Sequence, residues 1–428
     1  MAAVSMATLL RKDLRPLRIP AFRLYWTGQA ASSFGDGMVP VVTAFAVIGQ
    51  GGGAVELGGV LAVGLLCRLV TTLVGGVLAD RVARLRLMAV ADAMRFTVQF
   101  ALGVLLATGH GSALVLAVGN ALYGIGAGFF GPASKGLMPT LVGKDLIQQG
   151  VALQALTRST CMIVGPAVAG MLVPLAGAQT VYMIDAATFA VNIVVLLRLP
   201  GGAARGDGGQ SFRADLVQGW SEIVRRRWVS ANLVVHALWN FGMAVFFVLG
   251  PVLTDKRFGG SAAWGMVSAG MAVGSFTGGL LALRWQPRRP LVAGNLVLIV
   301  SGLPLLALWS GWATPWLALA AAVADCCVVL LNTLWEATLQ RVIPDQLLSR
   351  VASYDFLLTM MSMPLAYAVI GPVTGAVGTD GTLLGGAVLV TVPCLWVCLL
   401  PSVRRITGPD TETEPPATGP RADLAEAA

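Results

Sequence analysis

Long apolar stretches separated by short polar segments fill the chain from about residue 22 to residue 401. Each is close to the roughly 20 apolar residues that an α-helix needs to cross a bilayer. Helices are favoured for such stretches because lipid offers unpaired backbone groups no hydrogen-bond partners. The pattern therefore predicts an all-α membrane protein with twelve transmembrane helices, at 22–49, 55–79, 86–107, 112–131, 150–175, 179–198, 228–253, 261–283, 290–309, 313–337, 347–377 and 381–401.

The second half of the chain repeats the first. Residues 75–92 read GGVLADRVARLRLMAVAD, and residues 278–295 read GGLLALRWQPRRPLVAGN, a displacement of 203 positions (278 − 75). A second echo pairs GPAVAG at 165–170 with GPVTG at 371–375. These echoes predict two six-helix pseudo-repeats, and parallel repeats of this kind place a substrate path between the halves near the bilayer midplane.

The segments outside the predicted helices complete the domain organisation. We expect a cytoplasmic N-terminal segment at 1–21, six-helix bundles at 22–198 and 228–401, and a cytoplasmic linker at 199–227. The linker starts with a flexible Gly-rich stretch. Its residues 212–228 carry apolar side chains at helical spacing opposite charges, which predicts an interfacial amphipathic helix. The tail at 402–428 is rich in Pro, Thr, Glu and Ala, which predicts disorder.

Composition excludes a soluble domain, and the distribution of charge excludes a nucleic-acid partner. The chain is 56% apolar and 12% charged, with a mean hydropathy of +0.77. Its 29 Lys and Arg residues outnumber its 21 Asp and Glu residues, which gives a net charge of +8. With the N-terminus inside, all but five of the Lys and Arg residues fall on cytoplasmic segments: Arg68, Arg95 and Arg158 lie in the membrane, and Lys256 and Arg257 lie outside. This positive-inside bias predicts that both termini are cytoplasmic, with the basic N-terminal segment against membrane lipids.

The turn after the second predicted helix, GVLADRVARLR at 76–86, resembles the signature loop of the major facilitator superfamily, although Ala83 stands where the family usually has Gly. The resemblance covers about residues 20–402. It implies that Asp80 stabilises the closed cytoplasmic side by contacting the start of the eleventh helix, where the helix dipole is positive. The alternative is that these charged residues only stabilise the packing of the helices. The residues assigned to the gating loop and its charge cluster are Gly76, Asp80, Arg81, Arg84, Asp92 and Arg95.

Further stretches resemble the bacterial drug:proton antiporters that include macrolide and enterobactin exporters. They are FRLYWTGQ at 22–29, FGD at 34–36 and the paired loops at 132–153 and 339–353. In the fifth predicted helix, Gly165, Pro166 and Gly170 resemble the superfamily's antiporter motif, although Cys161 stands where a preceding glycine is expected. The resemblance implies proton-coupled efflux.

Ionisable residues inside predicted helices are candidates for function, because charge in the bilayer is costly. At about 1.5 Å per residue, Asp36 and Asp325 lie near the midplane, and Arg68 lies about 18 Å inside its helix end. A buried carboxyl group binds a proton more readily than an exposed one. Asp36 is the first candidate for proton coupling because the resemblance also implies an acidic residue on the first helix. We expect Arg68 to pair with Asp36 in the empty protein; a permanent pair would prevent titration. The remaining candidates are Arg158, Asp185 and Asp355.

Four side chains are candidates for lining a substrate cavity: Tyr123, His236, Trp239 and Asn240. A histidine facing other helices is also typical of a packing residue. The sequence contains no phosphate-binding loop, metal-ligand cluster or catalytic constellation, and it holds two His residues on different helices. We therefore expect neither enzymatic activity, nor a metal, nor a cofactor.

These features predict a monomeric secondary transporter of the bacterial cytoplasmic membrane. It would use alternating access to export a hydrophobic or amphipathic small molecule, such as a drug, macrolide or siderophore, in exchange for protons. One alternative is an importer of a polar nutrient, although few Arg, Asn or Gln residues fall at the midplane. Another is a non-transporting membrane scaffold or sensor.

Overall fold

Helices make up the computed structural model, which describes residues 15–143, 146–199, 223–343 and 345–408 and has no strand in these ranges. The first half contains η1 (Arg15–Arg18), α2 (Pro20–Gly49), α3 (Ala54–Arg81), α4 (Arg84–Ala107), α5 (Ala113–Val142) and α6 (Ile147–Arg198). The second half contains α8 (Arg227–Arg257), α9 (Gly260–Ala282), α10 (Pro290–Leu298), η3 (Ile299–Gly302), α11 (Leu303–Trp309), α12 (Thr314–Val342), α13 (Asp345–Leu399) and α14 (Pro401–Arg404).

Two helices each contain two membrane spans. Within the described ranges, 10 helices are long and apolar enough to cross a membrane. α6 is broken at Gly177, with φ +81°, and α13 is broken at Gly378, with φ +76°. Both angles lie in the left-handed region that glycine adopts without steric cost. The two breaks, 201 residues apart (378 − 177), divide these helices into four spans, which agrees with the predicted twelve. α10, η3 and α11 together form the predicted span at 290–309.

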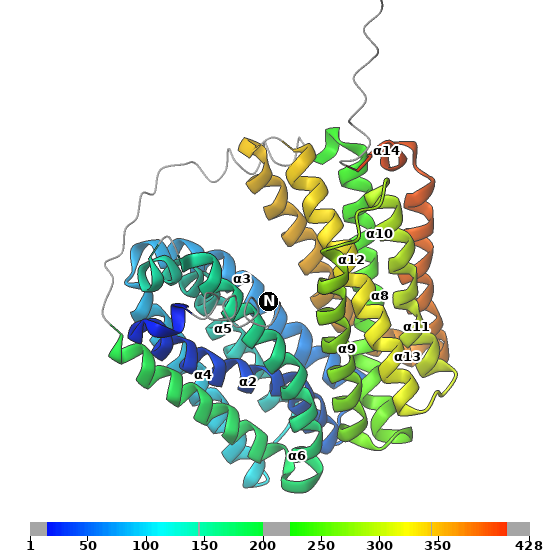
Figure 1. The fold of residues 1–428 in the computed structure, drawn as a ribbon. Helices are drawn as coiled ribbons and strands as arrows, with labels where there is room; N and C mark the ends of the chain where they lie inside the picture. Colours follow the sequence, from blue (N-terminus) through cyan, green and yellow to red (C-terminus); the bar gives the residue numbers. More distant parts are fainter. Residues whose placement is uncertain (1–14, 144–145, 200–222, 344, 409–428) are drawn as a thin grey trace, which may run out of the picture.

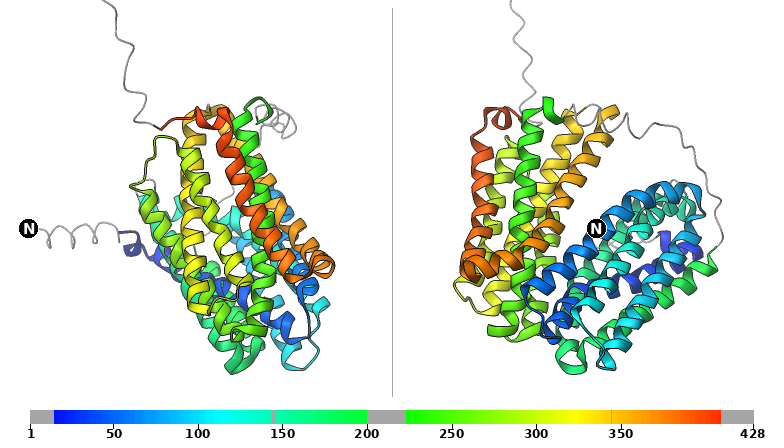
Figure 2. Two further views of the ribbon diagram at one scale, coloured as in Figure 1. Left: turned by 90° about the vertical axis from the view of Figure 1, so that its right-hand side faces the viewer. Right: turned by 180° about the vertical axis from the view of Figure 1, so that it is seen from behind.

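The two halves diverge from one end of the molecule to the other. Figure 1 shows the blue-to-green first half and the green-to-red second half meeting at one end, and Figure 2 shows the same arrangement from behind. The halves contact each other where α3 packs against α13 and where α6 packs against α9. We call the end where they meet the closed end, and the end that carries α14 and the flanks of the linker the open end.

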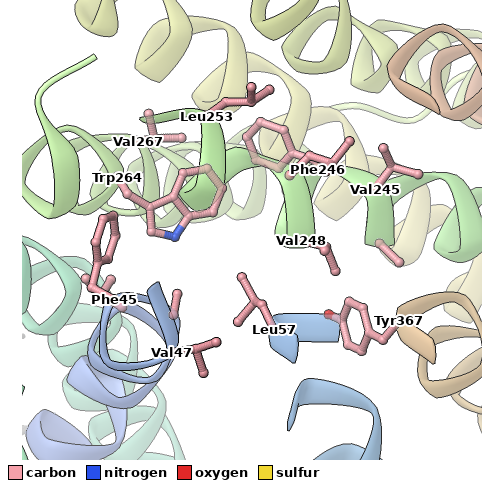
Figure 3. Close-up of a cluster of buried hydrophobic side chains, with 14 of the residues drawn as sticks. Phe45, Val47, Leu57, Val245, Phe246, Val248, Leu253, Trp264, Val267 and Tyr367 are labelled. Atoms are coloured by element: carbon pink, nitrogen blue, oxygen red, sulfur yellow. The ribbon is translucent and has the colours of Figure 1, made fainter. Parts of the chain in front are cut away.

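A buried apolar cluster joins the halves at the closed end. Phe45 of α2 and Leu57 of α3 lie against Val248 of α8, Trp264 of α9 and Tyr367 of α13 (Figure 3), and all five belong to one cluster of buried side chains. We call these five residues the hydrophobic seal. Each is less than a tenth exposed, so water is excluded from this end of the path between the halves.

Local capping fixes the helix starts at the closed end. The backbone N–H of Gly53 donates to Glu56 Oε2 at 2.7 Å at the start of α3. The Ser112 hydroxyl accepts a hydrogen bond from the Val115 backbone at 3.2 Å at the start of α5. Such bonds satisfy amide groups that have no partner within the helix. The predicted amphipathic helix at 212–228 and the predicted disordered tail lie largely outside the described residues.

Candidate substrate cavity and its polar network

A cavity of about 950 Å³ lies between the halves. Most of its lining comes from α2, α3, α5 and α6 of the first half, and Phe247, Met363 and Tyr367 line it from the second half. It extends from Tyr367, in the hydrophobic seal, to Met138 near the end of α5. Its size is that of a site for a drug-sized molecule.

Asp36 of α2 lies on the cavity wall, where two side chains hold its carboxylate. Tyr123 Oη of α5 donates to Asp36 Oδ1 at 2.5 Å. Arg95 Nη1 of α4 lies 3.4 Å from the same oxygen. The Asp36 side chain is 36% exposed, whereas that of Arg95 is 3% exposed. Asp36 therefore stands between the cavity and a buried cation.

Arg95 is fixed by ring contacts and by a second carboxylate. Its guanidinium carbon lies 4.5 Å from the ring centroid of Phe130 and 4.4 Å from that of Phe189. Arg95 Nη2 donates to Asp92 Oδ1, one turn earlier on α4. Arg95 Nε has no hydrogen-bond partner among the described residues. The guanidinium thus links the cavity-facing Asp36 to Asp92, which is fully buried.

Amide side chains extend this network through the first half. Asn192 Nδ2 of α6 donates to Asp92 Oδ2 at 2.5 Å, and Gln29 Nε2 of α2 donates to Asn192 Oδ1 at 3.3 Å. Gln29 itself lines the cavity. The network therefore starts at the cavity wall, passes through buried Asp92 and returns to the wall.

A third carboxylate of the first half lies close to this network. Asp185 of α6 is fully buried and accepts a hydrogen bond from Gln99 Nε2 of α4. Thr188 Oγ1 bonds to the Asp185 backbone carbonyl at 2.7 Å. Asp185 is thus satisfied by an amide, and it does not line the cavity.

The prediction that Asp36 pairs with Arg68 was wrong. The ion pair of Asp36 is with Arg95, and no ion pair joins it to Arg68 in the described structure. Arg68 lies on the cavity wall with an exposed side chain. Depth along a helix placed the two residues at the same level, but the side on which a residue points depends on helix rotation and packing.

The two candidate carboxylates of the second half, Asp325 and Asp355, lie in separate surroundings. Asp325 of α12 accepts a hydrogen bond from Ser275 Oγ of α9 and lines a small apolar void together with Trp239. Asp355 of α13 accepts a hydrogen bond from Trp335 Nε1 at 2.9 Å. Neither carboxylate lines the 950 Å³ cavity.

The cavity-lining candidates divide into two groups. Tyr123 lines the large cavity. His236 and Asn240 of α8 do not, because both are buried: the His236 ring packs on Trp335 at 5.1 Å, and Asn240 Nδ2 donates to the His236 carbonyl at 3.0 Å. Trp239 donates to Ser301 Oγ at 2.6 Å on the side of the small void.

The residues assigned to gating fall into three places. Gly76, Asp80 and Arg81 lie at the end of α3, and their side chains are outside the part that the structure describes. Arg84 begins α4. Asp92 and Arg95, expected in the charge cluster of that loop, instead form the network with Asp36.

The glycines of the antiporter motif lie at two close helix contacts of α6. Gly165 packs against the backbone of Gly37 in α2. Five residues further along α6, Gly170 packs against α9 of the other half, and Ser261 Oγ donates to its carbonyl at 3.1 Å. Pro166 is buried between them. The motif therefore joins α2 of its own half to α9 of the other.

Sequence reasoning missed Gln29, Gln99 and Asn192. A signal for two of them was present in the spacing, because Asp92, Arg95 and Gln99 recur at three and four residues and so share a helix face. Asp185 and Asn192 are likewise seven residues apart on α6. No group of three His, Cys, Asp or Glu side chains placed to hold a metal occurs in the searched, described part of the chain.

A model of the Major Facilitator Superfamily matches residues 25–367, most of both bundles. The chain belongs to this superfamily. Membership makes it a multi-pass bacterial membrane transporter for a small-molecule substrate, not an enzyme.

Relatives within the superfamily align along nearly their whole length. The multidrug efflux pump Tap of Mycobacterium tuberculosis (strain ATCC 25618 / H37Rv) is 27% identical over 416 residues, covering 91% of this chain and 95% of Tap. Macrolide efflux protein A of Streptococcus pyogenes is 22% identical over 383 residues, covering 87% and 94%.

Solved structures share the fold. The nucleoside transporter NupG superposes with a TM-score of 0.71 at 12% identity, covering 88% of this chain and 98% of NupG. A bacterial homologue of the human lysosomal transporter Spinster, crystallised inward-facing and unoccupied, superposes with a TM-score of 0.67 at 12% identity, covering 91% and 98%.

Proposed function

We propose that this transporter exports hydrophobic or amphipathic small molecules in exchange for protons, by alternating access. The observation that carries the proposal is Asp36, a partly exposed carboxylate on the wall of a 950 Å³ cavity, beside a buried arginine. The names of the efflux relatives support the direction of transport. The aromatic and methionine side chains of the cavity suit apolar parts of a substrate.

Proton binding at Asp36 would change the partner of Arg95. While Asp36 is ionised, Arg95 lies between it and Asp92. A proton on Asp36 neutralises its carboxylate and removes the ionic attraction between Asp36 and Arg95, so that Arg95 keeps its ion pair with Asp92 alone. Tyr123 and Arg95 come from α5 and α4, so this change alters contacts among three helices of the first half. A change of helix contacts on proton binding is the coupling that an antiporter requires.

The distribution of basic residues gives the proposed orientation. The positive-inside rule places the linker and both termini in the cytoplasm, so the open end faces the cytoplasm of the bacterium. The cavity would then receive substrate from the cytoplasm or the inner leaflet, with the hydrophobic seal closing the outer side. We infer that one chain suffices, because its own two halves enclose the cavity.

Accumulation measurements test the proposal. Cells expressing the chain are loaded with a panel of antibiotics, dyes and siderophores, with and without a protonophore. We expect lower accumulation of at least one compound, and loss of the difference when the proton gradient collapses. Higher accumulation of a polar nutrient instead would show an importer, and a difference that survives the protonophore would show another energy source.

A further inference from the structure

Two arginines that line the cavity have no acidic partner among the described residues. Arg68 of α3 and Arg158 of α6 both line the cavity with exposed side chains. Among the described residues, neither takes part in an ion pair, and neither guanidinium group makes a hydrogen bond. The acidic residue in the cavity lining is Asp36, and Arg95 and Tyr123 already hold it.

Both arginines lie well inside their helices. Arg68 lies near the middle of α3, about 20 Å from either end, and Arg158 lies about 17 Å from the start of α6, at about 1.5 Å per residue. Arginines at such depth face a cavity or a partner, and they mark substrate paths. The carboxylates of Asp92 and Asp185 are fully buried and do not line the cavity. A ligand in the cavity therefore meets a positive surface.

Much of the rest of the lining is apolar or aromatic, with uncharged polar side chains such as Gln29 and Asn120 among it. Trp26 and Phe130 of the first half and Phe247 and Met363 of the second half border the same space. Guanidinium groups bind carboxylate, phosphate and sulfonate oxygens with paired hydrogen bonds. The arrangement combines two free guanidinium groups with a large apolar wall.

From this arrangement we infer that the cavity binds amphipathic acids: molecules with an aromatic or aliphatic body and an anionic group held by Arg68 and Arg158. The inference rests on the proposed efflux function and narrows its substrate class. An anionic lipid headgroup shares this chemistry, so the experiment must separate a free acid from a lipid.

Equilibrium dialysis of the purified transporter tests the inference. The protein is placed in nanodiscs of phosphatidylcholine, with empty nanodiscs as blanks. The probes are anilinonaphthalene sulfonate and phenylnaphthylamine, which has the same ring system without the sulfonate. The variants are Arg68→Gln, Arg158→Gln and the double variant. Arg257→Gln is the matched control, because Arg257 is exposed at the end of α8 and does not line the cavity.

We expect the ratio of sulfonate affinity to neutral-probe affinity to fall about tenfold in each single variant, as for loss of a hydrogen bond between charged groups. The ratio should fall further in the double variant and stay unchanged in Arg257→Gln. Retained binding of the neutral probe shows that the variants are folded. An unchanged ratio in the cavity variants overturns the inference.

Two further measurements keep the outcome decisive. If a variant binds neither probe, the salt dependence of probe binding to the wild-type protein is measured instead. We expect added salt to weaken binding of the sulfonate and to leave binding of the neutral probe unaffected. Equal salt dependence for the two probes overturns the inference. In nanodiscs that contain phosphatidylglycerol, the effect of the arginine variants must persist. Its disappearance assigns the arginines to lipid headgroups and overturns the substrate class. Dialysis uses no gradient, so these results do not depend on whether export is driven by protons.

Discussion

At the scale of single residues, Arg95 determines how charge is arranged in the first half. Its guanidinium lies between two aromatic rings and reaches Asp36 and Asp92 at once. Depth along a predicted helix identified Asp36 as a membrane carboxylate but gave the wrong arginine. Choosing between Arg68 and Arg95 needs the rotation of α3 and α4 about their axes, which the packing of all their neighbours sets. A single sequence contains little of that information.

The first prediction concerns Asp36. Asp36→Asn keeps the size of the side chain but removes its ability to exchange a proton. We expect gradient-driven export from reconstituted vesicles to be abolished, while substrate binding remains measurable. Asp380→Asn is the matched control, because Asp380 is exposed and away from the cavity. Wild-type export by Asp36→Asn under an imposed pH gradient would refute the role of this carboxylate.

The second prediction concerns the hydroxyl that holds Asp36. Tyr123→Phe removes the 2.5 Å hydrogen bond to Asp36 Oδ1. A hydrogen bond to a charged group is worth about 1.5–3 kcal/mol, so the exchange rate under a fixed gradient should fall by roughly tenfold or more. Tyr367→Phe, which also changes a cavity tyrosine but removes no hydrogen bond found in the structure, should export at close to the wild-type rate. Equal rates for the two variants would show that the Tyr123 hydroxyl is dispensable.

At the scale of helices, apolar length predicted the spans to within a few residues at most closed-end boundaries. The predicted spans at 150–175 and 179–198 correspond to the two parts of α6 on either side of Gly177. The predicted spans at 347–377 and 381–401 correspond in the same way to the two parts of α13 on either side of Gly378. Larger differences occur at the open end, where α5 continues to Val142 beyond the predicted residue 131. Apolar length marks the part of a helix inside lipid, and the part that projects beyond it has no such signature.

The third prediction concerns the contact between α6 and α9. A Cβ atom at Gly170 would lie 2.6 Å from the Ser261 carbonyl oxygen, so Gly170→Leu must push the halves apart at the closed end. We expect slower export and easier cysteine labelling of residues in the hydrophobic seal. Gly375→Leu is the matched control, because a Cβ there meets no atom within 4 Å. Wild-type rates and labelling for Gly170→Leu would show that this contact is not needed to hold the closed end together.

At the scale of the whole molecule, the repeated sequence predicted the two halves and the path between them, and the structure opens that path at one end. Which end is open could not be predicted from the sequence. A conformation open at one end and a conformation open at the other contain the same membrane spans. The described polar network around Arg95 belongs to the first half alone. In the second half, Asp325 and Asp355 have separate partners.

The fourth prediction concerns the balance between these conformations. Asp80→Asn removes a charge expected to stabilise the form that is closed at the linker end, a contribution of about 0.3–1 kcal/mol. Cysteines placed at the open end should therefore label faster, and turnover should slow. Glu56→Gln, at the opposite end of α3, serves as the charge control. Unchanged labelling and turnover in Asp80→Asn would remove this residue from the gate.

The hydrophobic seal also decides where the membrane voltage acts. A water-filled cavity conducts ions, so in this conformation the electrical potential at Asp36 is close to that of the solution at the open end. Nearly the whole voltage then falls across the short dry layer of Phe45, Leu57 and their partners. Moving one elementary charge through a drop of 100 mV changes the free energy by about 2.3 kcal/mol. The membrane voltage therefore acts mainly on the conformational change that moves the dry layer to the other side of the charged network. It acts little on the entry of a ligand or a proton into the cavity.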